Sequence, residues 1–272
     1  MIDISQQRTL SALAVGLLGL ALFGCAKTSQ VQTKLDKPGV VETKPKWDYS
    51  EQSGPGEWGK LSPDYVLAAI GSSQSPIDIV TEDVITADLP SLKLETRPAP
   101  LKVLDNGHTV EVIAPAGSTL QYGKQTFTLK QYHFHAPSEH TINGKHAKVE
   151  VHFVYSDGAG QLAVIGVLVE EGEEDNPIFL SILEDQAPTK PGEMKVFPNI
   201  LVDIKEFFPQ SDKYFMYDGS LTTPPASEGV RWFVCADPVY LSRRQIHVLS
   251  NLYYHNNRPV QPANARTVLT PR

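Results

Sequence analysis

The sequence predicts a mainly β protein with minor α content, an α+β fold class. Its 21 prolines and 19 glycines separate short runs in which apolar and polar residues alternate, as they do in strands joined by turns. With 272 residues, of which 41% are hydrophobic, the chain can bury the core of one large domain or of two small ones. A net charge of −7 without basic clusters gives no reason to expect a nucleic-acid partner.

Residues 1–24 have the features of an export signal. Residues 10–24 are uninterrupted apolar or small residues that follow a polar start. A run of about fifteen residues suits a signal peptide and is short for a membrane-spanning helix. The four residues Leu22–Cys25 resemble the lipobox of bacterial lipoproteins, which would place a diacylglycerol group on Cys25 after cleavage before it. Cleavage near Ala26 without lipidation is the alternative, and both predict an exported protein of the periplasm or cell envelope.

Residues 25–46 are predicted to form a flexible tether between this signal and the folded domain. The segment is polar, low in large apolar residues and interrupted by proline, so it cannot bury enough surface to fold. Its excess of lysine would suit an anionic membrane surface, although a charged run is more often simply solvated. A lipid anchor on Cys25 would therefore hold the domain at a membrane.

Residues 47–272 carry the alternating pattern of strands. The segment Leu101–Ala114 predicts a hairpin whose two strands meet at Asn106-Gly107, a strong turn dipeptide. The continuous apolar run Gly160–Val169 predicts a strand that is buried on both faces. Short helix or loop segments and one C-terminal helix are expected at Asn176–Asp185, Ile200–Phe208 and Ser242–Leu249.

Three histidines lie on two predicted strands within Gln131–Val154. His133 and His135 are two residues apart, so both rings project from the same face of a strand. His152 lies in the alternating run VEVHFVY, and pairing the two strands around the turn-like INGK brings three imidazoles to one point. Three neutral nitrogen ligands with one open position are the ligand set of a catalytic zinc site. From these residues alone, histidines of the core or surface remain an equally good interpretation.

The same stretch resembles the signature of the α-class carbonic anhydrases, in Gln131–His135, Ser138–Thr141 and Glu150–His152. Further motifs of that family extend over Trp47–Arg266, namely WDYSEQSGPGEW, SSQSPIDI, KYFMYDGSLTTPPASEGVRWFV and NNRPVQPANAR. The resemblance implies one domain over residues 47–272, built on a large twisted, mostly antiparallel central sheet with short peripheral helices. It also implies reversible hydration of carbon dioxide to bicarbonate and a proton, by attack of zinc-bound hydroxide, in a monomer or homodimer.

The resemblance assigns the metal-binding residues of the site. His133, His135 and His152 would hold Zn²⁺. Gln131 would orient His133, and Glu150 would orient His152, because a ligand ring needs its other nitrogen fixed. A backbone carbonyl would serve the remaining histidine.

Other matching residues would act on the substrate and on protons. Thr222 would accept a hydrogen bond from the hydroxide and donate one from its own hydroxyl group to Glu139, while Thr223 would hydrogen-bond bicarbonate or entering anions. His108, in the N-G-H motif, would carry protons to solvent, a role that suits a side chain titrating near neutral pH. The pocket would be lined by Tyr49, Val154, Val164, Leu221 and Trp232.

The chain departs from the family pattern at several positions. Glu111 stands where many members have a polar amide, and Ala147 stands where most have an aromatic residue. The cysteines that form a disulfide in secreted bacterial members are replaced in the regions Ala68–Ile70 and Ala226. Cys235 is expected to be a buried strand thiol rather than a nucleophile.

Two other functions fit parts of the sequence. The segment HFHAPSE also matches the H-x-H-x3-E motif of cupins, in which Glu139 would be a ligand of iron or manganese. The second cupin motif is missing from the sequence, and SLTTPP would then be unexplained. A non-catalytic carbonic-anhydrase-like binding domain is the other alternative, but such domains typically lose a ligand histidine. This chain retains all three histidines together with Glu139 and Thr222.

Overall fold

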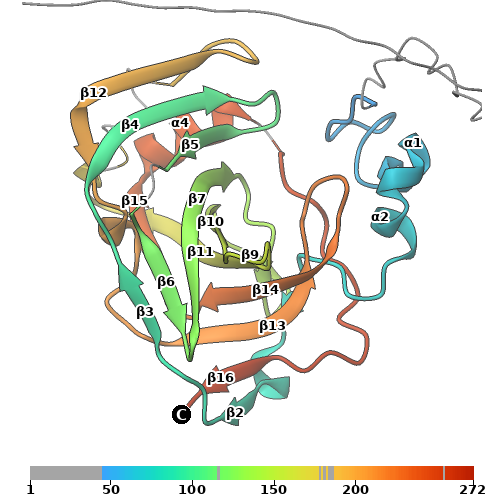
Figure 1. Cartoon of the computed structure of the whole chain (residues 1–272). Helices are drawn as coiled ribbons and strands as arrows, with labels where there is room; N and C mark the ends of the chain where they lie inside the picture. The colour runs from blue at the N-terminus through green and yellow to red at the C-terminus, as the bar shows by residue number, and fades with distance from the viewer. Residues whose placement is uncertain (1–44, 115–116, 178, 180–181, 183–186, 254) are drawn as a thin grey trace, which may run out of the picture. The chain divides into compact units, whose positions relative to one another are not determined.

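A twisted sheet of 13 strands dominates the part of the chain that the computed structural model describes, residues 45–114, 117–177, 179, 182, 187–253 and 255–272 (Figure 1). Its strands are β2 (Ile85–Ala87), β3 (Leu92–Glu95), β4 (Ala99–Asp105), β5 (Val110–Ile113), β6 (Thr119–Tyr122), β7 (Gln125–His135), β10 (Val149–Ser156), β11 (Leu162–Gly172), β12 (Met194–Val202), β13 (Tyr214–Ser220), β14 (Glu228–Cys235), β15 (Val239–Ser242) and β16 (Leu269–Pro271). The predicted signal peptide and nearly all of the predicted tether lie outside the described residues.

The strands follow the order β12-β4-β5-β7-β10-β11-β14-β13-β16-β2, with β15 beside β11 and β3 joined to β7 through β6. Most pairings are antiparallel, whereas β11 runs parallel to β14 and β15, and β16 runs parallel to β2. This arrangement confirms the large, mostly antiparallel sheet that the family resemblance implied. A second sheet of three short strands consists of β1 (Asp78–Ile79), β8 (Thr141–Ile142) and β9 (Lys145–His146).

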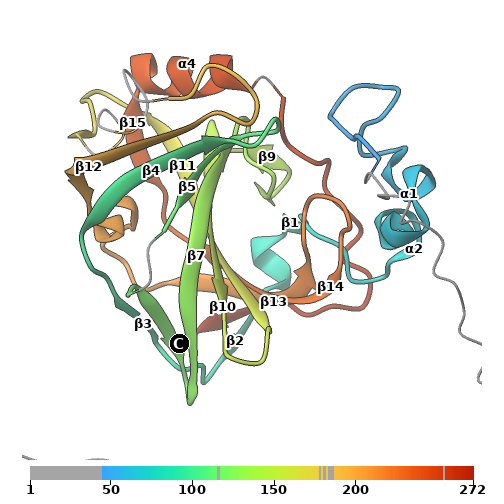
Figure 2. The same cartoon turned by 45° about the horizontal axis from the view of Figure 1, so that its top comes forward.

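The described helices are short and lie at the periphery, as Figure 2 shows for α4, α1 and α2. They are α1 (Trp58–Leu61), α2 (Leu67–Ile70), α4 (Arg243–Leu252) and the 3₁₀ turns η1 (Pro63–Tyr65), η2 (Thr81–Asp83) and η3 (Ile204–Phe207). The predicted helix at Ser242–Leu249 is present as α4. It begins at Ser242 because this side chain and Gln245 cap each other's backbone N–H groups reciprocally. No helix in the described ranges is long and apolar enough to cross a membrane.

The structure confirms one predicted element of the chain and corrects another. The predicted hairpin is formed by β4 and β5, in which Asp105 pairs with Val110 across the turn. The prediction of a helix or loop over Ile200–Phe208 was wrong at its start, because β12 continues to Val202 in antiparallel pairing with β4. The 3₁₀ turn η3 begins only after Asp203, whose Oδ1 accepts the backbone N–H of Lys205 at 3.0 Å. The segment Asn176–Asp185 lies partly outside the described residues.

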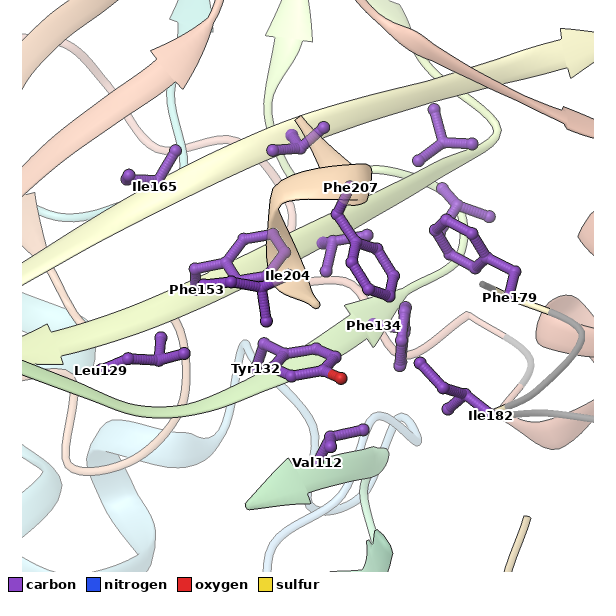
Figure 3. Close-up of a cluster of buried hydrophobic side chains, with 14 of the residues drawn as sticks. Val112, Leu129, Tyr132, Phe134, Phe153, Ile165, Phe179, Ile182, Ile204 and Phe207 are labelled. Atoms are coloured by element: carbon purple, nitrogen blue, oxygen red, sulfur yellow. The ribbon is translucent and has the colours of Figure 1, made fainter. Parts of the chain in front are cut away.

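An aromatic and aliphatic core covers one face of the central strands (Figure 3). Tyr132 and Phe134 of β7 point into it, and the ring of Tyr132 stacks on Phe153 of β10 at 5.2 Å between centroids. Phe207 of η3 closes the cluster over these rings. Because strand side chains alternate, His133 and His135, which alternate with Tyr132 and Phe134 on β7, must face the other side of the sheet.

A second apolar cluster involves side chains of β11, β13 and β14. It consists of buried Ile77, Ile79, Ala147, Val164, Leu168, Tyr217, Val230, Trp232 and Val234, with Val154, Leu221 and other partly buried side chains against them. Ala147 is 6% exposed within this cluster, so the position keeps an apolar contact although its side chain is small. Cys235 is buried and free, as predicted.

Candidate metal centre

Three histidine rings meet on the face of the sheet opposite the aromatic core. Antiparallel pairing of β7 and β10 places His152 directly opposite His133, and Glu150 opposite His135. The ring centroids are 5.0 Å apart for His133 and His135, 5.3 Å for His133 and His152, and 4.6 Å for His135 and His152. One ligand atom from each ring lies within 4.8 Å of the others. The convergence predicted from the sequence is therefore present.

In two of these rings the Nδ1 atom is already engaged, which leaves Nε2 available. His133 Nδ1 donates to Gln131 Oε1 at 2.8 Å, as predicted. His135 Nδ1 donates to the backbone carbonyl of Asn256 at 2.6 Å. The Nε2 of His135 is buried and has no hydrogen-bond partner. A buried nitrogen that lacks a partner is costly unless something else occupies its lone pair.

Glu150 fixes the third ring from the opposite side. Its Oε1 lies 2.9 Å from His152 Nε2, close but not aligned as a regular hydrogen bond. The same oxygen accepts His140 Nδ1 at 2.7 Å. Oε2 accepts the backbone N–H groups of Glu139 and His140 at 2.9 and 2.8 Å. Because Nε2 of His152 faces this carboxylate, Nδ1 is the atom left to serve as a ligand.

A glycine makes room for this carboxylate. Gly166 of β11 is paired with His152. A Cβ atom at this position would lie 2.6 Å from Glu150 Oε1, far inside ordinary contact distance. The absence of a side chain at Gly166 is therefore a requirement of the buried Glu150, which itself has no exposed surface.

The histidines are held in their neutral, metal-binding form. Burial lowers the pKa of His135 to about 4 and brings the pKa of His133 well below its ordinary value, with mutual repulsion among the rings adding to the effect on His133. The pKa of His152 is also lowered, chiefly by burial, although Glu150 opposes the shift. Three neutral imidazoles with inward nitrogens fit a zinc ion, which takes this ligand set in catalytic sites.

Glu139 is fully buried and lies beside two of the rings, with Oε1 3.6 Å from His135 Nδ1 and Oε2 3.8 Å from His152 Nδ1. Burial raises its pKa to about 7, while His152, the backbone N–H of Arg258 and Thr222 act in the opposite direction. Oε1 accepts that N–H of Arg258 at 2.8 Å, and Oε2 has no hydrogen-bond partner of regular geometry. The Thr222 hydroxyl is near enough to lower the pKa of Glu139, but it makes no well-aligned hydrogen bond to Oε2. Oε2 is the oxygen left to receive one.

The predicted pocket residues lie together. Thr222 and Thr223 follow β13 in a loop closed by the N–H of Leu221 donating to the carbonyl of Ser227 at 3.0 Å. Val154 pairs with Val164, and Val164 pairs with Trp232, on three successive strands. Leu221 packs against the same cluster, and the ring of Trp232 meets that of His152 at 4.8 Å. An apolar wall thus adjoins the three histidines.

His108 occupies the turn between β4 and β5, at the predicted position. Its ring stacks on Trp47, with centroids 3.6 Å apart and planes 9° from parallel. Burial lowers the pKa of His108, and the charges of Asp48 and Asp105 partly oppose this shift. Tyr49 meets Trp47 edge-on at 5.9 Å, and burial followed by the charge of Glu139 raises the pKa of its hydroxyl well above the usual value.

Two residues that complete the site, Asn256 and Arg258, have no role that could be predicted from the sequence. Asn256 supplies the carbonyl for His135, and its side-chain amide bonds Ala136 N–H and the Phe134 carbonyl at 2.9 Å each. Arg258 is 1% exposed and positions Glu139 through its backbone N–H. Both lie in the quoted segment NNRPVQPANAR, but only their contacts across the fold reveal what they do.

His140 belongs to a buried network rather than to the ligand set. Its Nδ1 donates to Glu150, and its Nε2 lies 2.6 Å from the hydroxyl of Tyr217. That hydroxyl is 2.8 Å from Ser75 Oγ. These contacts connect β10, β13 and the loop before β1. They hold the Glu150 carboxylate in place through His140.

Comparisons with known proteins agree with the family resemblance of the sequence. The family model described as eukaryotic-type carbonic anhydrase matches residues 53–272. A carbonic anhydrase of Nostoc sp. (strain PCC 7120 / SAG 25.82 / UTEX 2576) is 40% identical over 256 residues, which cover 93% of this chain and 94% of that protein. A carbonic anhydrase of Pectobacterium carotovorum is also 40% identical, over 82% of this chain and 90% of the relative.

Two solved structures are similar to the fold described above. The α-carbonic anhydrase from Thermovibrio ammonificans, in complex with the inhibitor sulfanilamide, has a TM-score of 0.79 and 42% identity, covering 83% of this chain and 99% of that chain. Dioscorin complexed with ascorbate has a TM-score of 0.74 and 28% identity, covering 83% of this chain and 97% of that chain.

Proposed function

Because this chain belongs to the eukaryotic-type (α) carbonic anhydrase family, we propose that it is a zinc enzyme that reversibly hydrates carbon dioxide to bicarbonate and a proton. The observation that carries the proposal is the convergence of three neutral imidazoles, with ligand atoms within 4.8 Å of one another. His133 and His135 would bind Zn²⁺ through Nε2, and His152 would bind through Nδ1. When bound, zinc supplies the positive charge that lowers the pKa of water to about 7, for which carbonic anhydrase is itself the standard example.

The chain's own groups hold the ligands in one protonation state. Gln131 Oε1 and the Asn256 carbonyl accept the Nδ1–H groups of two rings, which keeps each Nε2 free of a proton. Glu150 faces Nε2 of His152 and holds the proton there. Each acceptor therefore selects the tautomer that can bind a cation.

Thr222 and Glu139 would direct the reacting hydroxyl group. With Thr222 Oγ1 donating its hydrogen bond to Glu139 Oε2, Oγ1 can only accept a hydrogen bond from a group at the metal. A ligand at the metal that carries a hydrogen is then oriented by Thr222, and a ligand that lacks a hydrogen is disfavoured. The backbone N–H of Arg258 holds Glu139 in place for this role. Thr223 would bind bicarbonate, while Val154, Val164, Leu221 and Trp232 keep the substrate side dry.

Proton export would use His108. Its ring lies at the turn of the β4–β5 hairpin, half-buried against Trp47, with a pKa below the usual value. A histidine whose pKa lies near the working pH can accept a proton through water and release it to buffer.

Hydration kinetics with and without metal test the proposed activity. Stopped-flow carbon dioxide hydration by the purified protein should be lost on zinc chelation and regained on adding zinc. Thr222→Ala should retain full zinc content while its kcat/KM for carbon dioxide falls, since only hydroxyl orientation is removed. A zinc-loaded wild-type protein without hydration activity would contradict the enzyme assignment and favour a binding domain.

We also propose that the protein is exported and anchored through lipid on Cys25, on the basis of the Leu22–Cys25 motif. Cys25→Ser should shift the protein from the membrane fraction to the soluble fraction of the producing bacterium. An unchanged membrane fraction would count against the anchor.

A further inference from the structure

Glu111 lies on the wall of the metal centre without belonging to the ligand set. On β5 it is paired directly with His133 of β7, and His133 is paired with His152 of β10. On the other side, Glu111 is paired with Leu104 of β4. Residues directly opposite each other in antiparallel strands project from the same face and lie within about 5.5 Å at Cβ. The Glu111 carboxylate is therefore adjacent to a proposed zinc ligand.

No cation neutralises this carboxylate in the described part of the chain. Its one polar contact is with the side-chain amide of Asn106, at 3.3 Å. Lys102 projects from the same face of β4 as Leu104, yet it forms no ion pair with Glu111. Glu111 is partly exposed, so its charge does not need a protein partner. An unpaired negative charge thus stands beside the three histidines.

We propose that Glu111 makes the metal centre selective against small anions, bicarbonate included, by electrostatic repulsion. This inference rests on the proposed zinc centre. Carbon dioxide is uncharged and does not interact with a fixed charge in this way, whereas its product is an anion. The carboxylate acts through space on an anion at the metal and needs no contact with it.

The size of the effect follows from distance and solvent. An anion bound at the three histidines would lie on the order of 8 Å from the Glu111 carboxylate. Glu111 and His133 are partly exposed, so water reaches this side of the centre. With an effective dielectric constant of about 40 to 80, Coulomb's law gives a roughly two- to sixfold weaker anion affinity. High salt screens a pair at this separation, because the Debye length falls from about 10 Å at 0.1 M to about 3 Å at 1 M.

Glu111→Gln removes the negative charge and changes little else. Glutamine has nearly the same shape, and its Oε1 can still accept the Asn106 amide proton, so the β4–β5 turn keeps its contact. Glu111→Asp retains the charge. Glu95→Gln makes the same change in net charge on β3, which reaches β7 only through β6 at the far end from His133.

The probe is thiocyanate, titrated calorimetrically into zinc-loaded protein of measured metal content at low ionic strength. Glu111→Gln should bind thiocyanate two- to sixfold more tightly than wild type, and Glu111→Asp and Glu95→Gln should match wild type. The difference should shrink at high ionic strength.

Equal affinities of wild type and Glu111→Gln would overturn the inference, as would an equal gain in Glu95→Gln. If zinc-loaded wild type and variant both failed to bind thiocyanate, the bound metal would offer no open position to an anion, and the proposed catalytic role of the centre would be refuted together with this inference.

Discussion

Gly166→Ala should weaken zinc binding by displacing Glu150, although the added methyl group touches no ligand nitrogen. The new Cβ would lie 2.6 Å from Glu150 Oε1, at least 0.8 Å inside the 3.4 Å at which ordinary contact begins. The carboxylate cannot simply rotate away. Its two oxygens hold His140 Nδ1 and two backbone N–H groups at 2.7 to 2.9 Å.

Both available responses are costly. If the backbone moves, overpacking of a filled interior typically costs about 1–3 kcal/mol of unfolding free energy. If Glu150 moves, one charge-assisted hydrogen bond is lost, about 1.5–3 kcal/mol, and His152 loses the acceptor that fixes its tautomer. Loss of such a partner typically weakens metal affinity by about 10- to 100-fold. We expect a change of that size in the zinc dissociation constant, with a lower melting temperature of the metal-free protein.

Competition with a chromophoric chelator measures the zinc affinity, and thermal unfolding with and without metal measures stability. Gly158→Ala is the matched control, because its added Cβ meets nothing within 4 Å and its backbone φ is not positive. If Gly166→Ala and Gly158→Ala bound zinc equally tightly and melted at the same temperature, the steric argument would be wrong.

Three further predictions concern protons. Trp47→Ala should raise the pKa of His108 toward about 6.5, since burial is the main cause of its lowering, and an NMR titration of the ring that showed no change would contradict this. His108→Ala should slow turnover in dilute buffer and recover with imidazole, and undiminished turnover would remove His108 from proton export. Zinc should stay bound as the pH falls from 6.5 toward 5 and be released as it approaches 4, because the depressed pKa of His135, about 4, keeps the ligand neutral until then. Metal analysis after dialysis would check this, and half-release above pH 6 would be inconsistent with buried, neutral ligands.

The alternation of side chains along β7 and β10 made the metal centre predictable from sequence. The two-residue spacing of His133 and His135 fixed their common face, and the reversal of the chain through β8 and β9 returned β10 antiparallel to β7, which placed His152 beside them. Family motifs then identified Thr222 and Glu139, which no local pattern would single out.

Contacts between distant segments could not be predicted in this way. The carbonyl of Asn256 reaches His135 across 121 positions, and the N–H of Arg258 reaches Glu139 across 119. A backbone group carries no side-chain identity, so nothing in the local sequence marks it as an acceptor or donor for the site. The extension of β12 through Ile200 was missed for a related reason, because its strand pairing with β4 is also nonlocal.

The two faces of β7 have a consequence for how folding of this protein can be followed. His133 lies between Tyr132 and Phe134, which are 2% and 4% exposed in the aromatic core. A slip of one residue in the β7–β10 pairing would turn the imidazoles into that core and the aromatic rings toward the pocket. A misregistered chain could keep its strand content and compactness but would not assemble three ligands. Stoichiometric metal uptake would therefore count correctly paired molecules in a refolded sample, which circular dichroism of the backbone cannot do.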